Sequence, residues 1–201
     1  MKKTGILLFA MSLLFMVEAI AQKPNVIKVL SFNILHGATT KGDFDLDKIA
    51  QVIKDADPDL VALQEVDYLT NRAKKYDLAT ELGWSTKMAP LFARAMPFDG
   101  GEYGECVLSK TSLLQTRNLA LPFTLGNEPR SAAAITTILS SGDTISFIGT
   151  HLDHLRDEKD RISQAKKINK EFSKNKYPSI LAGDLNAVPG STTMNIFEEV
   201  W

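Results

Sequence analysis

Two apolar runs joined by a short turn constrain the fold of this chain more than any other feature. Residues 132–139 and 144–150 are rich in β-branched and small apolar residues, and the turn Ser140-Ser141-Gly142-Asp143 separates them. This pattern predicts a β-hairpin, and therefore an antiparallel sheet. The same reasoning predicts further strands, which are expected at 26–34, 60–64, 84–93, 103–109, 113–119 and 180–182.

Helical periodicity occurs in a few segments between these runs. Asp45 can cap a helix whose apolar residues recur at helical spacing. Residues 76–82 predict a short helix closed by Gly83, and residues 157–174 predict a longer surface helix. Helices placed at intervals between paired strands predict an α/β layered sandwich with substantially antiparallel sheets, in a single domain over residues 22–201.

The N-terminus has the features of a secretory signal peptide. Two lysines precede the apolar run 5–17, and the small residues Ala19 and Ala21 follow it. These three parts predict cleavage after residues 1–21 and export to the periplasm or the extracellular space. An uncleaved anchor ranks second, because Glu18 interrupts the apolar stretch, so no stable membrane span is expected after processing. The mature protein is expected to be a monomer.

Composition excludes several kinds of chemistry. The single cysteine, Cys106, excludes an internal disulfide and a multi-cysteine zinc site, and its apolar neighbours favour a packed side chain. Segment 149–154 overlaps the H-x-H-x-D-H pattern of zinc hydrolases, but Gly149 replaces the first histidine and no histidine follows His154. A serine hydrolase lacks its G-x-S-x-G motif. The formal net charge of −1 gives no general attraction to a polyanion.

Polar residues recur where apolar strands are expected to end, and this is the strongest functional signal in the sequence. They are Asn33, Glu65, His151, Asp184 and Asn186. A rigidly held carboxylate such as Glu65 suits Mg²⁺, whose other ligands are waters and phosphate oxygens. Mn²⁺ is a second candidate ion. Together these groups predict metal-assisted hydrolysis of a phosphate ester.

Each of these side chains has a predicted role in that reaction. Asn33 can support the metal or a phosphate oxygen without adding negative charge. His151, as an imidazolium, can donate to a phosphoryl oxygen that gains charge. Asp184 can orient or deprotonate the attacking water, and the amide of Asn186 can fix the geometry.

The chain resembles the endonuclease/exonuclease/phosphatase superfamily, the DNase-I-like Mg²⁺ enzymes. The resemblance rests on five ordered motifs: Ser31-Phe32-Asn33-Ile34, Leu63-Gln64-Glu65-Val66, Tyr103-Gly104 with Leu108-Ser109-Lys110, Thr150-His151-Leu152-Asp153, and Gly183-Asp184-Leu185-Asn186-Ala187. It implies a two-sheet α/β sandwich flanked by helices, with the active site at one end of the sheets.

The resemblance also implies roles for particular residues. By similarity, Glu65 is the metal ligand with Asn33 beside it, His151 contacts phosphate, and Asp184 and Asn186 handle the nucleophilic water. Arg130 is a candidate substrate contact, whereas Arg161 is expected to be structural and to bridge to a nearby acid. No role is assigned to Asp153 and His154.

One departure from the superfamily concerns the C-terminus. Members carry a further Ser-Asp-His motif, and no such motif follows residues 183–187 before Trp201. The fold is therefore expected to be C-terminally incomplete, with an unpaired sheet edge, and the 201-residue chain is expected to be inactive or nearly so. A non-catalytic secreted binding protein with the same fold is the alternative. The substrate stays open among nucleic acid, phospholipid head groups, inositol phosphates and other small phosphoesters.

Overall fold

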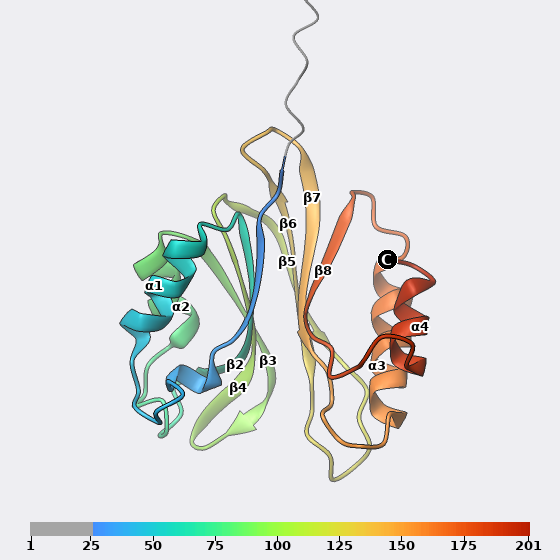
Figure 1. Cartoon of the computed structure of the whole chain (residues 1–201), viewed down its shortest axis with the longest axis horizontal. Coiled ribbons are helices and arrows are strands. Elements are labelled where there is room, and N and C mark those ends of the chain that lie inside the picture. Colours follow the sequence, from blue (N-terminus) through green and yellow to red (C-terminus); the bar gives the residue numbers. More distant parts are fainter. Residues whose placement is uncertain (1–25) are drawn as a thin grey trace, which may run out of the picture.

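The computed structural model describes residues 26–201, and these form two β-sheets packed face to face between two pairs of helices (Figure 1). The predicted signal peptide lies outside the described residues. No helix in the described part is long and apolar enough to cross a membrane. The elements in chain order are β1 (Val29–Asn33), the 3₁₀ turn η1 (Leu35–Gly37), α1 (Leu46–Ala56), β2 (Leu60–Tyr68), α2 (Leu78–Thr86), β3 (Ala89–Phe98), β4 (Gly101–Ser109), β5 (Leu113–Ala120), β6 (Ser131–Ile138), β7 (Thr144–His151), α3 (Lys159–Phe172), β8 (Ser179–Asp184) and α4 (Thr192–Glu198).

Each of the two sheets has four strands. The first has the order β1-β2-β4-β3 and the second β5-β6-β7-β8. The predicted hairpin is confirmed as β6 and β7, which pair antiparallel with Ala132 opposite Thr150. Two pairs are parallel, β1 with β2 and β7 with β8. The predicted α/β two-sheet sandwich flanked by helices is therefore confirmed, and β1 and β8 are edge strands of the described sheets.

Each helix pair covers the outer face of one sheet. α1 begins as predicted, because the Asp45 carboxylate accepts a hydrogen bond from the Lys48 backbone N–H. Its apolar stripe, including Ile49 and Ile53, packs with α2 on the first sheet. On the second sheet, Ile168 of α3 and Phe197 of α4 belong to an equivalent apolar cluster. These helices remove from water the sheet faces that do not meet each other.

The segment around Gly83 differs from its prediction. α2 runs through Gly83 to Thr86, and β3 begins only at Ala89. A Cβ at Gly83 would come within 2.9 Å of the Met88 carbonyl oxygen and of the Pro90 ring. Glycine therefore permits close contact between the helix and the following strand, whereas the left-handed residue that ends the helix is Lys87.

The layer between the sheets contains small residues at its centre. Ala62, Ala93 and Ala133 are fully buried there, together with Val107 and Phe147. At Gly149 of β7, a Cβ would meet Cγ1 of Val107 at 2.5 Å and Cβ of Ala62 at 3.2 Å. The two sheets therefore approach each other closely where β7 crosses β2 and β4.

Gly149→Ala is expected to destabilise the protein by about 1–3 kcal/mol, because the added methyl group overpacks the layer between the sheets. Val107→Ala in the same chain removes the obstructing methyl groups, so the double variant is expected to be more stable than the sum of the two single effects predicts. Urea denaturation of the four proteins measures this coupling. Strictly additive losses would show that the sheets are not in contact at this point.

Candidate active site

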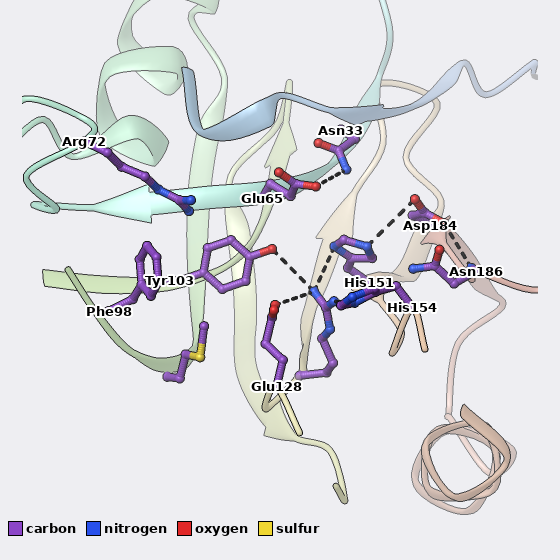
Figure 2. A pocket seen from close by; sticks show the side chains of 12 residues that line it. Asn33, Glu65, Arg72, Phe98, Tyr103, Glu128, His151, His154, Asp184 and Asn186 are labelled. Atoms are coloured by element: carbon purple, nitrogen blue, oxygen red, sulfur yellow. Dashed lines mark hydrogen bonds and ion pairs between the residues drawn. The ribbon is translucent and has the colours of Figure 1, made fainter. Parts of the chain in front are cut away.

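All six predicted site residues line a single pocket at one end of the two sheets (Figure 2). Its volume is about 410 Å³, within the range of small-molecule sites. The six are Asn33, Glu65, Arg130, His151, Asp184 and Asn186. The pocket thus brings together side chains that lie up to 153 positions apart in the sequence.

Glu65 reaches the pocket from within a strand, and the prediction that it ends a strand was wrong. β2 continues to Tyr68, and its pairing with β4 shifts between Leu63 and Val66, so Gln64 and Glu65 together oppose Glu105. This is a β-bulge, and Glu65 has the left-handed φ of 58°. The apolar run ends at Gln64 in sequence, but buried residues beyond it keep the strand in the sheet. The bulge turns the Glu65 carboxylate towards the pocket.

Asn33, on the neighbouring strand β1, holds this carboxylate, and His36 lies beside it in the turn that follows β1. The Asn33 Nδ2 donates to Glu65 Oε1 at 2.8 Å, and His36 Nδ1 lies 3.6 Å from Oε2. The Asn33 Oδ1 accepts from the Leu35 backbone N–H at 3.0 Å. Burial and the nearby Arg72 guanidinium lower the pKa of His36. Asn33 therefore orients the carboxylate, and His36, which sequence reasoning did not select, lies next to it.

The second sheet supplies the opposite wall. His151 ends β7 and Asp184 ends β8, and the parallel register places the two residues side by side. The Asp184 Oδ1 accepts from the backbone N–H of Asn186, whose Nδ2 donates to the Leu152 carbonyl at 2.9 Å. Gly183 has a φ of 149°, and a Cβ there would collide with the Thr150 carbonyl oxygen. Only glycine lets β8 approach β7 in this way.

Arg130 is buried below the two histidines and makes contacts with several neighbours. Its Nη1 lies 3.1 Å from His151 Nδ1, and its Nη2 lies 3.1 Å from His154 Nδ1. Glu128 forms an ion pair with Nη1 at 3.1 Å, and the Tyr103 hydroxyl lies 3.4 Å away. Arg130 is buried, with 3% of its surface exposed. Its protein contacts position the histidines, and its contact with substrate stays a prediction.

The contact with Arg130 fixes the tautomer of His151. A guanidinium only donates hydrogen bonds, so Nδ1 of His151 must accept, and the neutral ring then carries its proton on Nε2. Nε2 lies 3.8 Å from Asp184 Oδ2, which is too long for a hydrogen bond. The Nε2–H is therefore available to a group bound in the pocket.

His151 is neutral at physiological pH, so it does not meet the condition of being an imidazolium. Burial, followed by the positive charge of Arg130, lowers the pKa of His151 to about 4, although Asp184 and Glu65 act in the opposite direction. A neutral ring with a fixed Nε2–H can still donate to a phosphoryl oxygen.

Sequence reasoning missed the far end of the pocket. Arg72 and Phe98 lie at that end with Tyr103 beside them (Figure 2), and Met96 also lines the pocket. Tyr103 belongs to a quoted motif, but no role was assigned to it. Arg72 lies in the loop after β2 and had no detectable signal, because a lone arginine in a polar segment is usually a surface residue.

Glu105 was also missed, and it is fully buried on β4 opposite the bulge that carries Glu65. Neither carboxyl oxygen has a hydrogen-bond partner among the described residues. Burial raises the pKa of Glu105 well above its usual value, against the smaller opposing effect of Arg130. Burial thus disfavours the charged form of this carboxyl group in the layer below the pocket.

The donors in the pocket suit a hard cation. Glu65 and Asp184 offer carboxylate oxygens, the ligand type that Mg²⁺ and Mn²⁺ prefer, whereas the amide oxygen of Asn33 accepts a hydrogen bond from the Leu35 backbone N–H. Within residues 26–201 no three His, Cys, Asp or Glu side chains form a ready-made metal cage. Mg²⁺ is commonly held by one or two carboxylates together with waters and substrate phosphate. The residues present therefore fit such an ion.

Two other expectations concern residues outside the pocket. Arg161 donates from Nη1 to the Asp153 carbonyl at 3.0 Å and lies 4.0 Å from the Asp153 carboxylate, so its structural role is confirmed. Cys106 is fully buried in the cluster under α1 and α2, where burial raises the pKa of its thiol. It packs as a small apolar residue.

Comparisons with known proteins identify the family. The sequence profile of the Endonuclease/Exonuclease/phosphatase family matches residues 30–199. The chain belongs to this family. Enzymes of the endonuclease/exonuclease/phosphatase family are hydrolases of phosphoesters that generally use divalent metal ions. The comparison with curated protein sequences gives no significant match.

Solved structures of the endonuclease/exonuclease/phosphatase family share the fold. One is an endonuclease/exonuclease/phosphatase from Beutenbergia cavernae, with a TM-score of 0.70 and 21% identity over 87% of this chain and 53% of that chain. A mannosyl-6-phosphatase from Bacteroides thetaiotaomicron gives 0.67 and 20% over 87% and 70%. The human Nocturnin catalytic domain with bound sulfate gives 0.64 and 21% over 84% and 67%. The chain thus spans about half of the first of these structures.

The free energy of unfolding is expected to increase with pH between about 4 and 6.5, by on the order of 2 kcal/mol. In this range the unfolded chain protonates His151 and the folded chain does not, so acid favours unfolding, and the stabilisation is complete above pH 6.5. Urea denaturation at several pH values measures the slope. In His151→Gln most of this pH dependence of stability is expected to be lost, and the part due to His36 is expected to remain. An unchanged slope in this variant would contradict the lowered pKa.

Proposed function

We propose that this protein is a Mg²⁺-dependent hydrolase of small phosphate esters. One observation carries the proposal. The Glu65 carboxylate and its Asn33 partner, from the first sheet, face His151 and Asp184 of the second sheet across one pocket. Metal-assisted phosphoester hydrolysis requires metal ligands on one side of the substrate. On the other side it requires groups that bind a phosphoryl oxygen and orient a water molecule.

Glu65 would hold the metal ion, with Asn33 as its neighbour and Asp184 on the opposite side. When bound, Mg²⁺ supplies positive charge that stabilises the negative charge developing on the phosphoryl oxygens. Mn²⁺ can satisfy the same oxygen donors. The hydrogen bond from Asn33 fixes the rotamer of the Glu65 carboxylate, so little reorganisation is needed on binding.

The remaining groups act on the phosphoryl group and the water. The Nε2–H of His151 donates to a phosphoryl oxygen, and Arg130 holds the ring in the required tautomer. Asp184 accepts a proton from the attacking water while the oxygen of that water forms a bond to phosphorus. The ester oxygen departs with the electrons of the broken P–O bond and takes up a proton. Asn186 positions Asp184 through its backbone N–H.

The pocket favours a small substrate. Its volume of about 410 Å³ holds a phosphate group and one additional ring, and Arg72 and Glu128 stand at its sides. The related mannosyl-6-phosphatase supports a phosphomonoester of this size, while a phosphodiester of a small alcohol stays within the proposal. We also propose export, which rests on the sequence of residues 1–21 alone.

Glu65→Gln tests the proposal, because it removes the charge of the metal ligand and keeps its size. Mn²⁺ affinity, measured by calorimetry, is expected to fall at least about tenfold, and the residual Mg²⁺-dependent hydrolysis of p-nitrophenyl phosphate that the chain retains without the Ser-Asp-His motif is expected to be lost. Glu81→Gln, an exposed position on α2, is the matched control and should leave both unchanged.

Two outcomes would argue against this function. Equal Mn²⁺ affinity and hydrolysis in Glu65→Gln and the parent protein would show that the metal is held elsewhere. Metal and phosphate binding by the parent protein without any Mg²⁺-dependent hydrolysis would favour the alternative of a non-catalytic binding protein.

A further inference from the structure

Arg72 is held rigidly at the end of the pocket that the proposed hydrolysis does not use. Its Nε and Nη2 donate to the two carboxylate oxygens of Asp67 at 2.7 and 2.8 Å, and Asp67 is fully buried. The guanidinium also lies over the Phe98 ring, 4.4 Å from its centroid. A bidentate ion pair and a ring contact together fix a side chain that would otherwise adopt many conformations.

The free edge of this guanidinium faces the pocket. The Arg72 side chain is 32% exposed and lines the pocket opposite Asp184 (Figure 2). Its Nη1 makes no hydrogen bond to any of the described residues. The fixed geometry therefore presents donors to a bound molecule, at little entropic cost on binding.

The charges around the pocket decide which chemical group these donors would take. Glu65, Glu128 and Asp184 contribute three negative charges to its lining, against two positive charges from Arg72 and Arg130. Asp67 additionally compensates Arg72. A divalent cation and a phosphate dianion cancel each other, so the occupied pocket keeps an excess of negative charge. A second anion at the Arg72 end would meet net repulsion, whereas a neutral hydroxyl group would not.

Apolar side chains limit the choice further. Phe98 and Met96 lie beside Arg72, and the Tyr103 ring separates this end from Arg130. A group that meets both guanidinium donors and apolar surface needs hydrogen-bond acceptors together with carbon surface. A hydroxylated ring has this combination, and a simple alkyl or aryl group lacks the oxygen acceptors.

We propose that Arg72, with Phe98 and Met96, binds the hydroxylated ring of the leaving group, so that the substrate is the phosphate ester of a polyol such as a sugar or a cyclitol. This inference rests on the proposed function, because it assumes that the phosphoryl group lies between Glu65 and His151. Arg72 would then determine specificity by donating hydrogen bonds to ring hydroxyls. The chemistry at phosphorus belongs to the other end of the pocket.

Calorimetry with Mg²⁺ tests the inference, in a His151→Gln background that slows consumption of the ligand and leaves the charges of the pocket unchanged. Three probes are compared: inorganic phosphate, glucose 6-phosphate and glucose 1,6-bisphosphate. Glucose 6-phosphate is expected to bind at least about tenfold more tightly than phosphate, because hydrogen bonds from a charged donor are worth this much. The affinity for glucose 1,6-bisphosphate is expected to be no higher than the affinity for glucose 6-phosphate.

Arg72→Met is expected to reduce the ratio of these two affinities to near one. Arg117→Met is the matched control, since Arg117 also pairs with a carboxylate, that of Glu171, and lies near an aromatic ring, but lines a different part of the surface. It should keep the full ratio. Arg72→Lys keeps a positive charge beside Asp67. This variant replaces Arg72→Met in the experiment if thermal unfolding shows that Arg72→Met does not fold. Its ratio should also fall, because the planar fork is lost.

The possible outcomes separate the inference from the proposed function. Phosphate binding without a preference for glucose 6-phosphate, or a preference that survives both Arg72 variants, would overturn the inference alone. Tighter binding of the bisphosphate that depends on Arg72 would also overturn it, in favour of a second anion. Absence of both Mn²⁺ and phosphate binding in the parent protein would instead contradict the proposed function.

Discussion

The close packing of the two sheets is the constraint on which the candidate site depends. Glu65 belongs to one sheet and His151 to the other, so their separation is set by the layer between the sheets. That layer contains small residues, and at Gly149 there is no space for even a methyl group. Close-packed interiors transmit such constraints, because neither sheet can shift without creating a clash or a void. The opposing walls of the pocket are therefore fixed by apolar contacts a few residues away from them.

Burial then determines the protonation states at this end of the sandwich. The same low-dielectric environment lowers the pKa of His151 and raises the pKa of Glu105, because burial disfavours the charged form of a base and of an acid alike. Arg130 forms an ion pair with Glu128, and its guanidinium also contacts the rings of His151 and His154. The polar groups of the pocket are thus positioned before any ligand binds, which is the condition for electrostatic stabilisation of a transition state.

The extent to which the site could be predicted differs from residue to residue. His151 and Asp184 are the last residues of the buried strand β7 and the half-buried strand β8, which end where the apolar runs end, so their position was recognisable. Glu65 was correctly predicted to belong to the site, but it was wrongly predicted to end its strand. It lies in a β-bulge, which depends on pairing with β4 and leaves no periodic signal in the sequence of β2. Arg72 could not be selected at all. Its importance comes from Asp67 and Phe98, and the contact with Phe98 bridges 26 positions in the sequence.

The sequence by itself determined the strand-rich sandwich, the β6–β7 hairpin, the capped helix α1 and the motif residues that identify the family, because each of these is encoded in local periodicity or in short motifs. Only the tertiary structure decided the left-handed bulge at Glu65, the neutral state of His151, the buried acid Glu105 and the second end of the pocket at Arg72. These properties depend on distances between segments remote in sequence and on the exclusion of water between them. Packing of the whole chain sets both quantities, and no local pattern records them.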